Sequence, residues 1–250
     1  MAALTLDGVA GAGLARRWGV PQASYVATVG STLDTIHELG AQGAPSGTVV
    51  VAEVQTAGRG RDGRTWRSPA GGFWLGVLLR PAASDLGVYS IRAGLVVADA
   101  IDDLLPGARA RLKGPNDVVI ADRKVAGILC EGRWQGEALQ WLALGIGCNV
   151  TNDIPAELAE SATRLADHRP GSTRLDLGDR LVPALPRLGA SGLRLTDTEM
   201  LAFQGRDWLW GRAIRAPVAG RARGIRPDGA LMVETDGGLS AVREGHVALA

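Results

Sequence analysis

Four arginines and three glycines are concentrated in one short segment of the chain. The segment reads Gly58-Arg59-Gly60-Arg61-Asp62-Gly63-Arg64-Thr65-Trp66-Arg67, and Gln55 lies three residues before it. Guanidinium groups bind phosphate or carboxylate oxygens in pairs, and glycine lets backbone amides approach an anion closely. Because its like charges repel and its glycines are free, this loop is costly to order alone. The pattern therefore indicates a polyanionic ligand and favours nucleotide chemistry.

Two common nucleotide-binding motifs do not account for the loop. Gly58, Gly60 and Gly63 have the spacing of a dinucleotide fingerprint, but that fingerprint must open a helix whose N-terminus receives the pyrophosphate. Residues 65–72 show no helical period and contain Pro69, and the next expected element is a strand. The Gly-x4-Gly-Lys-Ser/Thr pattern of a P-loop is absent from the sequence. The Rossmann and P-loop interpretations are therefore rejected.

The composition is that of an ordinary globular protein. Of 250 residues, 46% are apolar and 21% charged, and the net charge of +1 argues against a general nucleic-acid binder. Cys130 and Cys148 lie in apolar runs and are expected to be reduced thiols, and the histidines are too scattered for a zinc site or a triad. Since neither a signal-peptide pattern nor a bilayer-length apolar run occurs, we expect a cytoplasmic protein without membrane contact.

Hydrophobic periodicity predicts an α+β fold with a mixed or antiparallel sheet, because most strands follow one another in hairpins. The expected strands are residues 25–29, 48–54, 73–79, 109–113, 118–120, 125–131 and 139–150. The expected helices are residues 14–18, 32–39, 89–105, 177–188 and 196–203. Ser31 or Thr32 is placed to cap the second of these helices. The arginine loop (residues 58–67) directly follows the most β-branched strand.

The character of the sequence changes after Gly205. Short alternating segments are separated there by Asp228-Gly229 and Asp236-Gly237-Gly238, which are typical of hairpin turns. We therefore predict a catalytic domain over residues 1–204 and a small β-barrel over residues 205–250. A core of that size is marginal unless it docks against a neighbour.

Four further motifs accompany the arginine loop and Gln55. They are Ser31-Thr32, Lys113-Gly114-Pro115-Asn116-Asp117, Lys124-Val-Ala-Gly-Ile-Leu129 and Gly145-Ile-Gly-Cys-Asn149. Together and in this order, the motifs resemble the biotin protein ligase family over essentially the whole chain. The resemblance implies a mixed sheet with helices mainly on one face and an SH3-like β-barrel at the C-terminus.

The resemblance also implies a reaction and its partners. Biotin and ATP form biotinyl-5′-AMP with Mg²⁺ present, and the biotinyl group then passes to a lysine of a biotin carboxyl carrier protein domain. Some members carry an N-terminal helix-turn-helix domain that represses transcription. Because few residues precede the first strand here, we expect the form without that domain and no DNA binding. The resemblance leaves a homodimer open.

Site residues follow from the resemblance motif by motif. Lys124, Arg61 and Arg59 are the expected catalytic residues, with the Lys124 ammonium between the biotin carboxylate and the α-phosphate. The biotin-binding residues implied are Ser31, Thr32, Gln55, Gly58, Arg59, Gly60, Arg61, Lys124 and Gly127. Those implied for ATP are Arg64, Trp66, Lys113, Asn116 and Asn149, and Asp117 is the implied Mg²⁺ ligand. Read without the resemblance, Ser31 is an N-cap, Lys124 a solvated hairpin lysine and Trp66 a core residue.

Two positions depart from the family pattern. The family often has Asn after Ser-Thr, where this chain has Leu33, and usually has Trp before Pro-Asn-Asp, where this chain has Gly114. Leu33 removes a polar contact near the biotin ring, and Gly114 removes one wall of the pocket. We expect altered affinities but an active enzyme, because neither change touches the charged groups.

Other functions stay open on the sequence. A lipoate or octanoate ligase or transferase shares the implied fold, although a linear acyl ligand does not need a polar site for a ureido ring. A non-catalytic module that binds biotin, or RNA through its arginines, is a second alternative. The glycines and charges of the arginine loop further suggest that it is mobile until a ligand binds.

Overall fold

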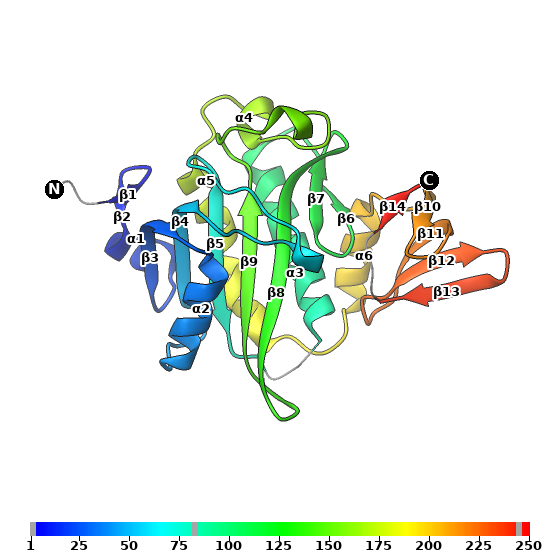
Figure 1. Cartoon of the computed structure of the whole chain (residues 1–250), viewed down its shortest axis with the longest axis horizontal. Coiled ribbons are helices and arrows are strands. Elements are labelled where there is room, and N and C mark those ends of the chain that lie inside the picture. Colours follow the sequence, from blue (N-terminus) through cyan, green and yellow to red (C-terminus); the bar gives the residue numbers. More distant parts are fainter. Residues whose placement is uncertain (1–3, 82–84, 244–246) are drawn as a thin grey trace.

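A mixed sheet of seven strands forms the centre of the molecule (Figure 1). The computed structural model describes residues 4–81, 85–243 and 247–250. The strands lie in the order β3-β4-β5-β9-β8-β7-β6, and only β3 and β4 pair in parallel. Their bounds are β3 (Ala23–Val29), β4 (Val49–Gln55), β5 (Phe73–Leu79), β6 (Arg111–Lys113), β7 (Asp117–Ile120), β8 (Arg123–Gln135) and β9 (Ala138–Cys148).

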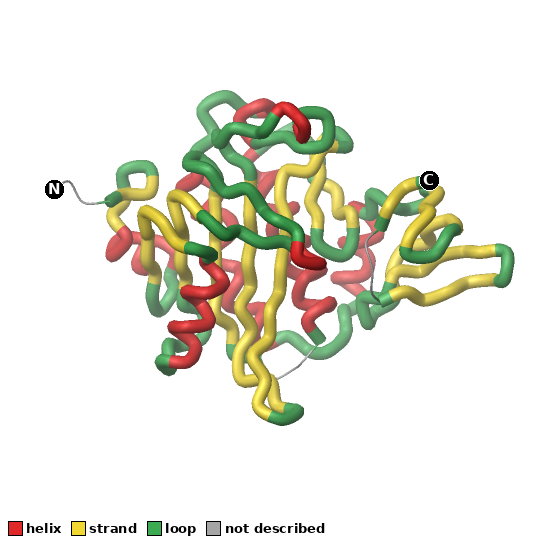
Figure 2. Tube along the Cα trace, viewed as in Figure 1, coloured by secondary structure: helices red, strands yellow, loops and turns green. Residues whose placement is uncertain are grey.

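Helices cover the two faces of this sheet unequally (Figure 2). One face carries the main core, built with α1 (Gly11–Trp18), α3 (Leu86–Leu104), α5 (Arg174–Leu181) and the 3₁₀ segment η3 (Val182–Ala190). The other face carries α2 (Thr32–Ala41), whose Leu33 and Ile36 pack on Val50, Leu78 and Ala143. The predicted α+β class, with helices mainly on one face, is confirmed. The rest of the second face is left for a cavity.

A second, antiparallel sheet follows α6 (Asp197–Arg206). Its strands are β10 (Ala213–Ala216), β11 (Gly220–Ile225), β12 (Leu231–Thr235), β13 (Gly238–Val242) and β14 (Ala248–Leu249), in the order β13-β12-β11-β10-β14. Trp208, Leu209, Ile214 and Val233 form its core together with Val119 of β7. The predicted small β domain is present, although no pairing among the described residues closes it into a barrel. A domain boundary at 204/205 stays a prediction.

Some predicted elements differ in extent. Strand β8 runs to Gln135, past the predicted end at residue 131, and the turn into β9 lies at Gly136, which has a φ of 59°. The expected helix over residues 177–188 divides into α5 and η3, because Pro183 and Pro186 cannot donate to an α-helical ladder. Two short strands, β1 (Thr5–Leu6) and β2 (Val9–Ala10), precede α1, and the short segments η1 (Arg61–Gly63), η2 (Ala156–Leu158) and α4 (Leu165–His168) lie in loops. Among the described residues, no helix is long and apolar enough to cross a bilayer.

Candidate active site

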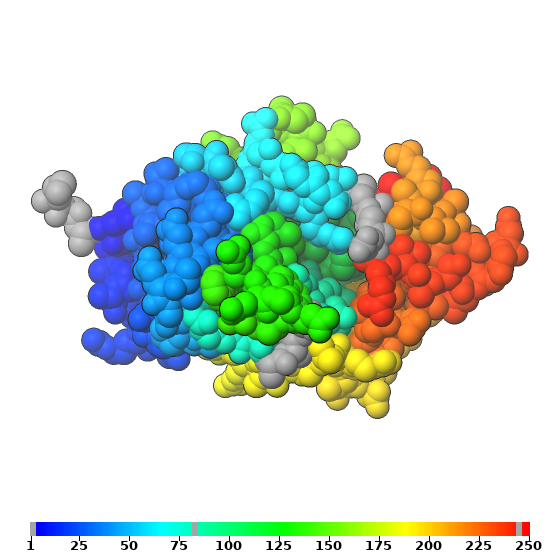
Figure 3. Space-filling view, turned by 60° about the horizontal axis from the view of Figure 1, so that its bottom comes forward, coloured from blue at the N-terminus to red at the C-terminus, as the bar shows by residue number. Residues whose placement is uncertain are grey.

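A cavity of about 350 Å³ lies beneath the arginine loop. In Figure 3 the loop, in cyan, lies between the blue N-terminal part and the orange and red C-terminal sheet. Every site residue predicted from the sequence lines this cavity except Gly58. Gly58, the first residue of the loop, packs against the opposite arm, where a Cβ atom would lie 2.4 Å from the Trp66 carbonyl oxygen. Motifs that are distant in sequence therefore converge on one hollow.

Glycines on β8 and β9 form the floor of the cavity. Gly127 and Gly147 are paired across the two strands, and the Trp66 indole lies on them. A Cβ atom on Gly147 would be 2.4 Å from Trp66 Nε1, and one on Gly127 would be 3.1 Å from Trp66 Cζ3. Only glycine leaves room for an aromatic ring against the strand backbone at these positions.

A β-bulge turns Lys124 into the cavity. Val119 of β7 pairs with Lys124, whereas its neighbour Val118 pairs with Ala126, so Val125 is an extra residue on β8. Regular alternation would place positions 124 and 127 on opposite faces of the sheet. With the bulge they share a face, and a Cβ atom on Gly127 would lie 3.2 Å from Lys124 Nζ.

The loop that follows β9 holds the Lys124 backbone from the other side. The Lys124 amide donates to the Ser161 carbonyl at 2.8 Å, and the Thr163 amide donates to the Lys124 carbonyl at 2.9 Å. The Thr163 side chain is fully buried, and its hydroxyl lies 3.0 Å from His168 Nε2. The backbone of Lys124 is thus held by this loop as well as by its pairing with β7.

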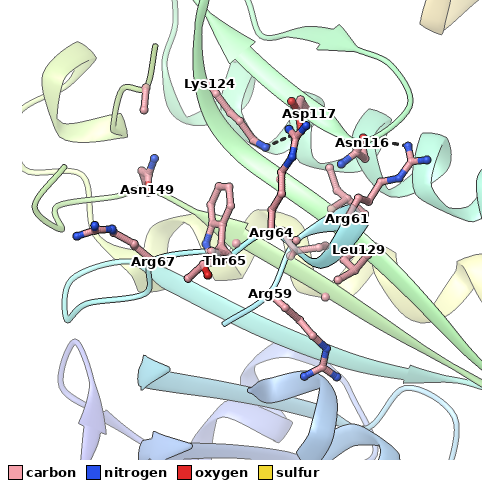
Figure 4. A pocket seen from close by; sticks show the side chains of 18 of the residues that line it. Arg59, Arg61, Arg64, Thr65, Arg67, Asn116, Asp117, Lys124, Leu129 and Asn149 are labelled. Carbon is pink, nitrogen blue, oxygen red and sulfur yellow. Dashed lines mark hydrogen bonds and ion pairs between the residues drawn. The ribbon is translucent and has the colours of Figure 1, made fainter. Parts of the chain in front are cut away.

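The Lys124 ammonium has two partners at the cavity wall (Figure 4). It lies 2.6 Å from Asp117 Oδ1 and 4.8 Å from the centre of the Trp66 ring. Lys124 is 31% exposed and Asp117 only 19%. A solvated hairpin lysine would not be held in this way, because exposed lysines gain little from a fixed partner. The site presents a positive charge that a phosphate or carboxylate can approach.

Arg59 is turned away from this group and bound by two acidic residues. Its guanidinium donates to both oxygens of Glu131, at 2.8 and 2.9 Å, and lies 2.7 Å from Asp34. Arg59, followed by His37, lowers the pKa of Glu131 to about 2. Because this pKa is below that of an unfolded glutamate, the pair stabilises the fold near neutral pH and is lost as the pH falls toward 2.

The remaining arginines of the loop have different surroundings. Arg61 donates to Asn116 Oδ1 at 3.4 Å, and Arg67 pairs with Glu157 at 3.2 Å. Arg64 has no ion pair among the described residues and points toward the side of the cavity that holds Lys124 (Figure 4). The expectation that the charges of the loop are unpaired is therefore wrong for Arg59 and Arg67. Arg61 and Arg64, which have no acidic partner among the described residues, are the loop cations available to a ligand.

Short polar side chains line the opposite end of the cavity. Ser31 Oγ caps α2 by accepting from the Leu33 amide at 3.3 Å. Gln55 Oε1 accepts from the Thr32 amide at 2.8 Å and from its hydroxyl at 3.0 Å, and Gln55 Nε2 donates to Ser68 Oγ at 2.7 Å. Ser31 is thus both an N-cap and a cavity residue. The Ser31 hydroxyl proton and a lone pair of Thr32 Oγ1 are left for a ligand.

Asn149 and Lys113 also interact with other parts of the protein. Asn149 is 7% exposed, and its amide donates to the Thr163 carbonyl at 3.2 Å while its oxygen accepts from Asn152. The Lys113 ammonium lies 5.4 Å from the centre of the Trp208 ring. Both residues line the cavity, so a nucleotide contact by either stays a prediction.

Several residues that line the cavity were not predicted from the sequence. Ile154, Pro155 and Leu158 come from the loop after β9, and Val247 directly precedes β14 of the C-terminal sheet. Loop residues follow no period, and which of them close a site depends on the tertiary fold. The apolar Ile-Pro pair within a polar loop was the one usable hint.

Comparison with known proteins settles the family. The model of the "Biotin/lipoate A/B protein ligase family" matches residues 25–149. The chain belongs to this family. Among its relatives, the "Biotin--[acetyl-CoA-carboxylase] ligase" of Mycobacterium tuberculosis is 33% identical over 92% of this chain and 89% of its own length. The "Bifunctional ligase/repressor BirA" of Bacillus subtilis is 31% identical over 90% of this chain and 73% of its own.

Solved ligase structures share the fold. The biotin protein ligase of Aquifex aeolicus in complex with biotin and ATP matches with a TM-score of 0.74 and 26% identity. The match covers 90% of this chain and 97% of that one, so it includes the small C-terminal sheet, which is SH3-like in this ligase fold.

The two departures from the ligase pattern lie at opposite ends of the cavity. Leu33 is 3% exposed and lies 3.1 Å from where a Cβ atom on Gly145 would be, so it fills the polar end with an apolar side chain. A Cβ atom on Gly114 would lie 3.3 Å from Phe203 Cζ. Phe203 of α6 therefore packs close to Gly114, and a larger residue at position 114 would have to displace its ring.

Proposed function

We propose that this protein activates biotin with ATP to form biotinyl-5′-AMP and transfers the biotinyl group to a lysine of a biotin carboxyl carrier protein domain. The arrangement of the cavity beneath the arginine loop carries the proposal. One end offers the hydroxyl groups of the buried Ser31 and Thr32 and the amide of Gln55, and the other end offers the cations of Lys124 and Arg64. Biotin has a polar ureido ring at one end and a carboxylate at the other, so it matches both.

The middle of the cavity suits the rest of the acid. Leu33 and Leu129 line it with apolar side chains, which fit a thiophane ring and a hydrocarbon chain. In this orientation the carboxylate lies toward Lys124, and the nucleotide lies over the Trp66 floor. The two reactants thus meet at the Lys124 end of the cavity.

The reaction needs no covalent intermediate on the enzyme. A biotin carboxylate oxygen bonds to the α-phosphorus of ATP, and the bond to the bridging oxygen breaks to release pyrophosphate. The carrier lysine then bonds through its neutral amine to the acyl carbon, AMP leaves with the bonding pair, and the amine loses a proton. Lys124 and Arg64 neutralise the oxygens that gain charge in the first step. The loops over the cavity exclude water from the mixed anhydride.

Asp117 and Asn116 suit a Mg²⁺ ion that is bound mainly by phosphates. Both line the cavity with oxygen atoms, the ligand type that Mg²⁺ prefers. Among the described residues there is no cluster of three or more His, Cys, Asp or Glu that could hold a metal alone. When bound with ATP, Mg²⁺ would offset the charge of the phosphates.

The alternatives have less support. The family model includes lipoate ligases, but a linear acyl acid would leave the polar groups at the Ser31 end without partners. An RNA module would need free arginines, whereas Arg59 and Arg67 bind acids of this chain. We also propose that the protein acts in the cytoplasm, where the free thiols of Cys130 and Cys148 would stay reduced.

Incubation with ATP, Mg²⁺, biotin and a purified carrier domain tests the function. We expect the carrier to gain the mass of one biotinyl group, and a carrier without its acceptor lysine to gain none. Lipoate in place of biotin should give no pyrophosphate exchange above background. Exchange with lipoate but not biotin would refute the proposal, as would an unmodified carrier.

A further inference from the structure

A chain of polar contacts ties the arginine loop to the polar end of the cavity. Arg59 reaches Glu131 on β8 and Asp34 in the first turn of α2, close to Ser31 and Thr32. We propose that Glu131 is a positioning residue that holds the arginine loop closed over the acid-binding end of the cavity, by binding Arg59. This inference rests on the proposed function for the identity of the acid.

The position of Glu131 along β8 supports this role. Gly127, Leu129 and Glu131 alternate along the strand and therefore project from one face. Gly127 and Leu129 line the cavity, and Glu131 lies just beyond them, at its edge. A residue there can anchor a loop that crosses the cavity without occupying ligand space.

The two arms of the arginine loop are bonded to each other, so a contact at Arg59 can hold the whole loop. It forms a narrow hairpin, in which Arg59 and Thr65 are bridged and the Gly60 amide donates to the Arg64 carbonyl at 2.7 Å. Fixing Arg59 therefore fixes Arg64 on the other arm. Glycines flank Arg59 on both sides, so without this anchor the hairpin has many conformations available.

The Glu131 carboxylate is in turn oriented by α2 and β9. His37 Nε2 lies 3.2 Å from Glu131 Oε2, and Trp141 Nε1 donates to His37 Nδ1 at 3.1 Å. Because an indole can only donate, Nδ1 must accept, and the imidazole proton lies on Nε2 facing Glu131. His37 thus donates from Nε2 to Glu131, and Glu131 with its pKa of about 2 stays ionised above acidic pH.

The network has a consequence for ligand binding. A bidentate arginine–carboxylate pair fixes geometry as well as charge. If the loop is closed before the acid arrives, binding does not have to supply the free energy of ordering it. When only a fraction of molecules is closed, the apparent affinity falls by that fraction. Loss of Glu131 should thus weaken acid binding more than it slows the chemical step.

The experiment compares Glu131→Gln with the matched control Glu137→Gln in ATP–pyrophosphate exchange. Glu137 lies at the exposed tip of the same hairpin. We expect Glu131→Gln to raise the KM for biotin by about tenfold, with kcat and the KM for ATP changed less than about threefold. Glu137→Gln should match the wild type. Arg59→Ala should raise the KM for biotin to a similar extent, and combining it with Glu131→Gln should add nothing.

A ligand-independent readout separates this inference from the proposed function. Without biotin or ATP, trypsin should cut after Arg61 and Arg64 faster in Glu131→Gln than in Glu137→Gln or the wild type. Unchanged cleavage and an unchanged KM for biotin would overturn the inference. The inference would also be overturned if Glu131→Gln raised the KM for biotin and the KM for ATP equally and lowered the Tm. Additive effects of Glu131→Gln and Arg59→Ala on the KM for biotin would overturn it as well. If the wild type shows no exchange, the proposed function fails and the cleavage rates still decide the role of Glu131.

Discussion

Replacement of Lys124 by alanine is expected to slow biotinyl-adenylate formation by about 10³-fold while the fold is retained. The ammonium is fixed in the cavity, 2.6 Å from Asp117 and above the Trp66 ring, where the carboxylate and the α-phosphate are to meet. Its removal takes away a preorganised positive charge and also leaves the Asp117 carboxylate, which is 19% exposed, without its partner. ATP–pyrophosphate exchange measures the loss, and thermal unfolding checks the fold.

Two variants separate the causes of that loss. Lys124→Ala combined with Asp117→Asn removes the unpaired carboxylate, so any activity it regains measures charge repulsion rather than the missing cation. Lys113 is the one other lysine of the chain and lines the same cavity beside Trp208. Lys113→Ala should therefore lower activity by less, about tenfold. Exchange near the wild-type rate in Lys124→Ala would show that this lysine does not contact the reacting groups.

The sequence was sufficient to select residues that gather around one cavity, because its motifs end strands or occupy turns. The arginine loop follows β4, and Lys124 and Gly127 belong to one strand, so the motifs had to meet on the sheet. Periodicity also identified the main strands and the long helix α3 to within a few residues at most ends. These features depend on local spacing, which a single sequence contains.

Features set by distant partners could not be predicted. The bulge at Val125 depends on how β7 pairs with β8, and it alone decides that Lys124 faces the cavity. The direction of Arg59 depends on Glu131, which lies 72 positions later in the chain. The composition gave no reason to distinguish the four arginines of the loop. In the fold, Arg59 binds Glu131, whereas Arg64 has no ion pair among the described residues.

The C-terminal sheet reaches the site through the segment that joins it to α6. The Trp208 amide donates to the Leu112 carbonyl of β6, and the Trp208 ring lies between Lys113 and Arg212, whose Cζ is 3.8 Å from its centre. Val247, which directly precedes β14, lines the cavity. A change in how this sheet packs would therefore alter the surroundings of Lys113, which lines the same cavity.

Larger side chains at position 147 are expected to slow adenylate formation, by about tenfold for Gly147→Ala and about 10²-fold for Gly147→Val. The first added carbon would lie 2.4 Å from Trp66 Nε1, so the ring would be displaced from the strand toward the cavity and away from its present contacts with Trp74 and Lys124. The strand itself should tolerate valine, since β-branched residues favour strands. The loss should therefore appear in exchange kinetics and not as unfolding.

Gly132 provides the matched control. It lies on β8, and a Cβ atom there would lie 2.7 Å from an indole nitrogen, that of Trp134. Trp134 is 42% exposed at the far end of the hairpin, so its ring can turn into solvent. Gly132→Val should then keep activity within about threefold of the wild type. If Trp66 transmits the effect, adding Gly147→Val to Trp66→Ala should cost little more than Trp66→Ala alone. Equal losses in Gly147→Val and Gly132→Val would mean that the glycine floor has no specific part in the reaction.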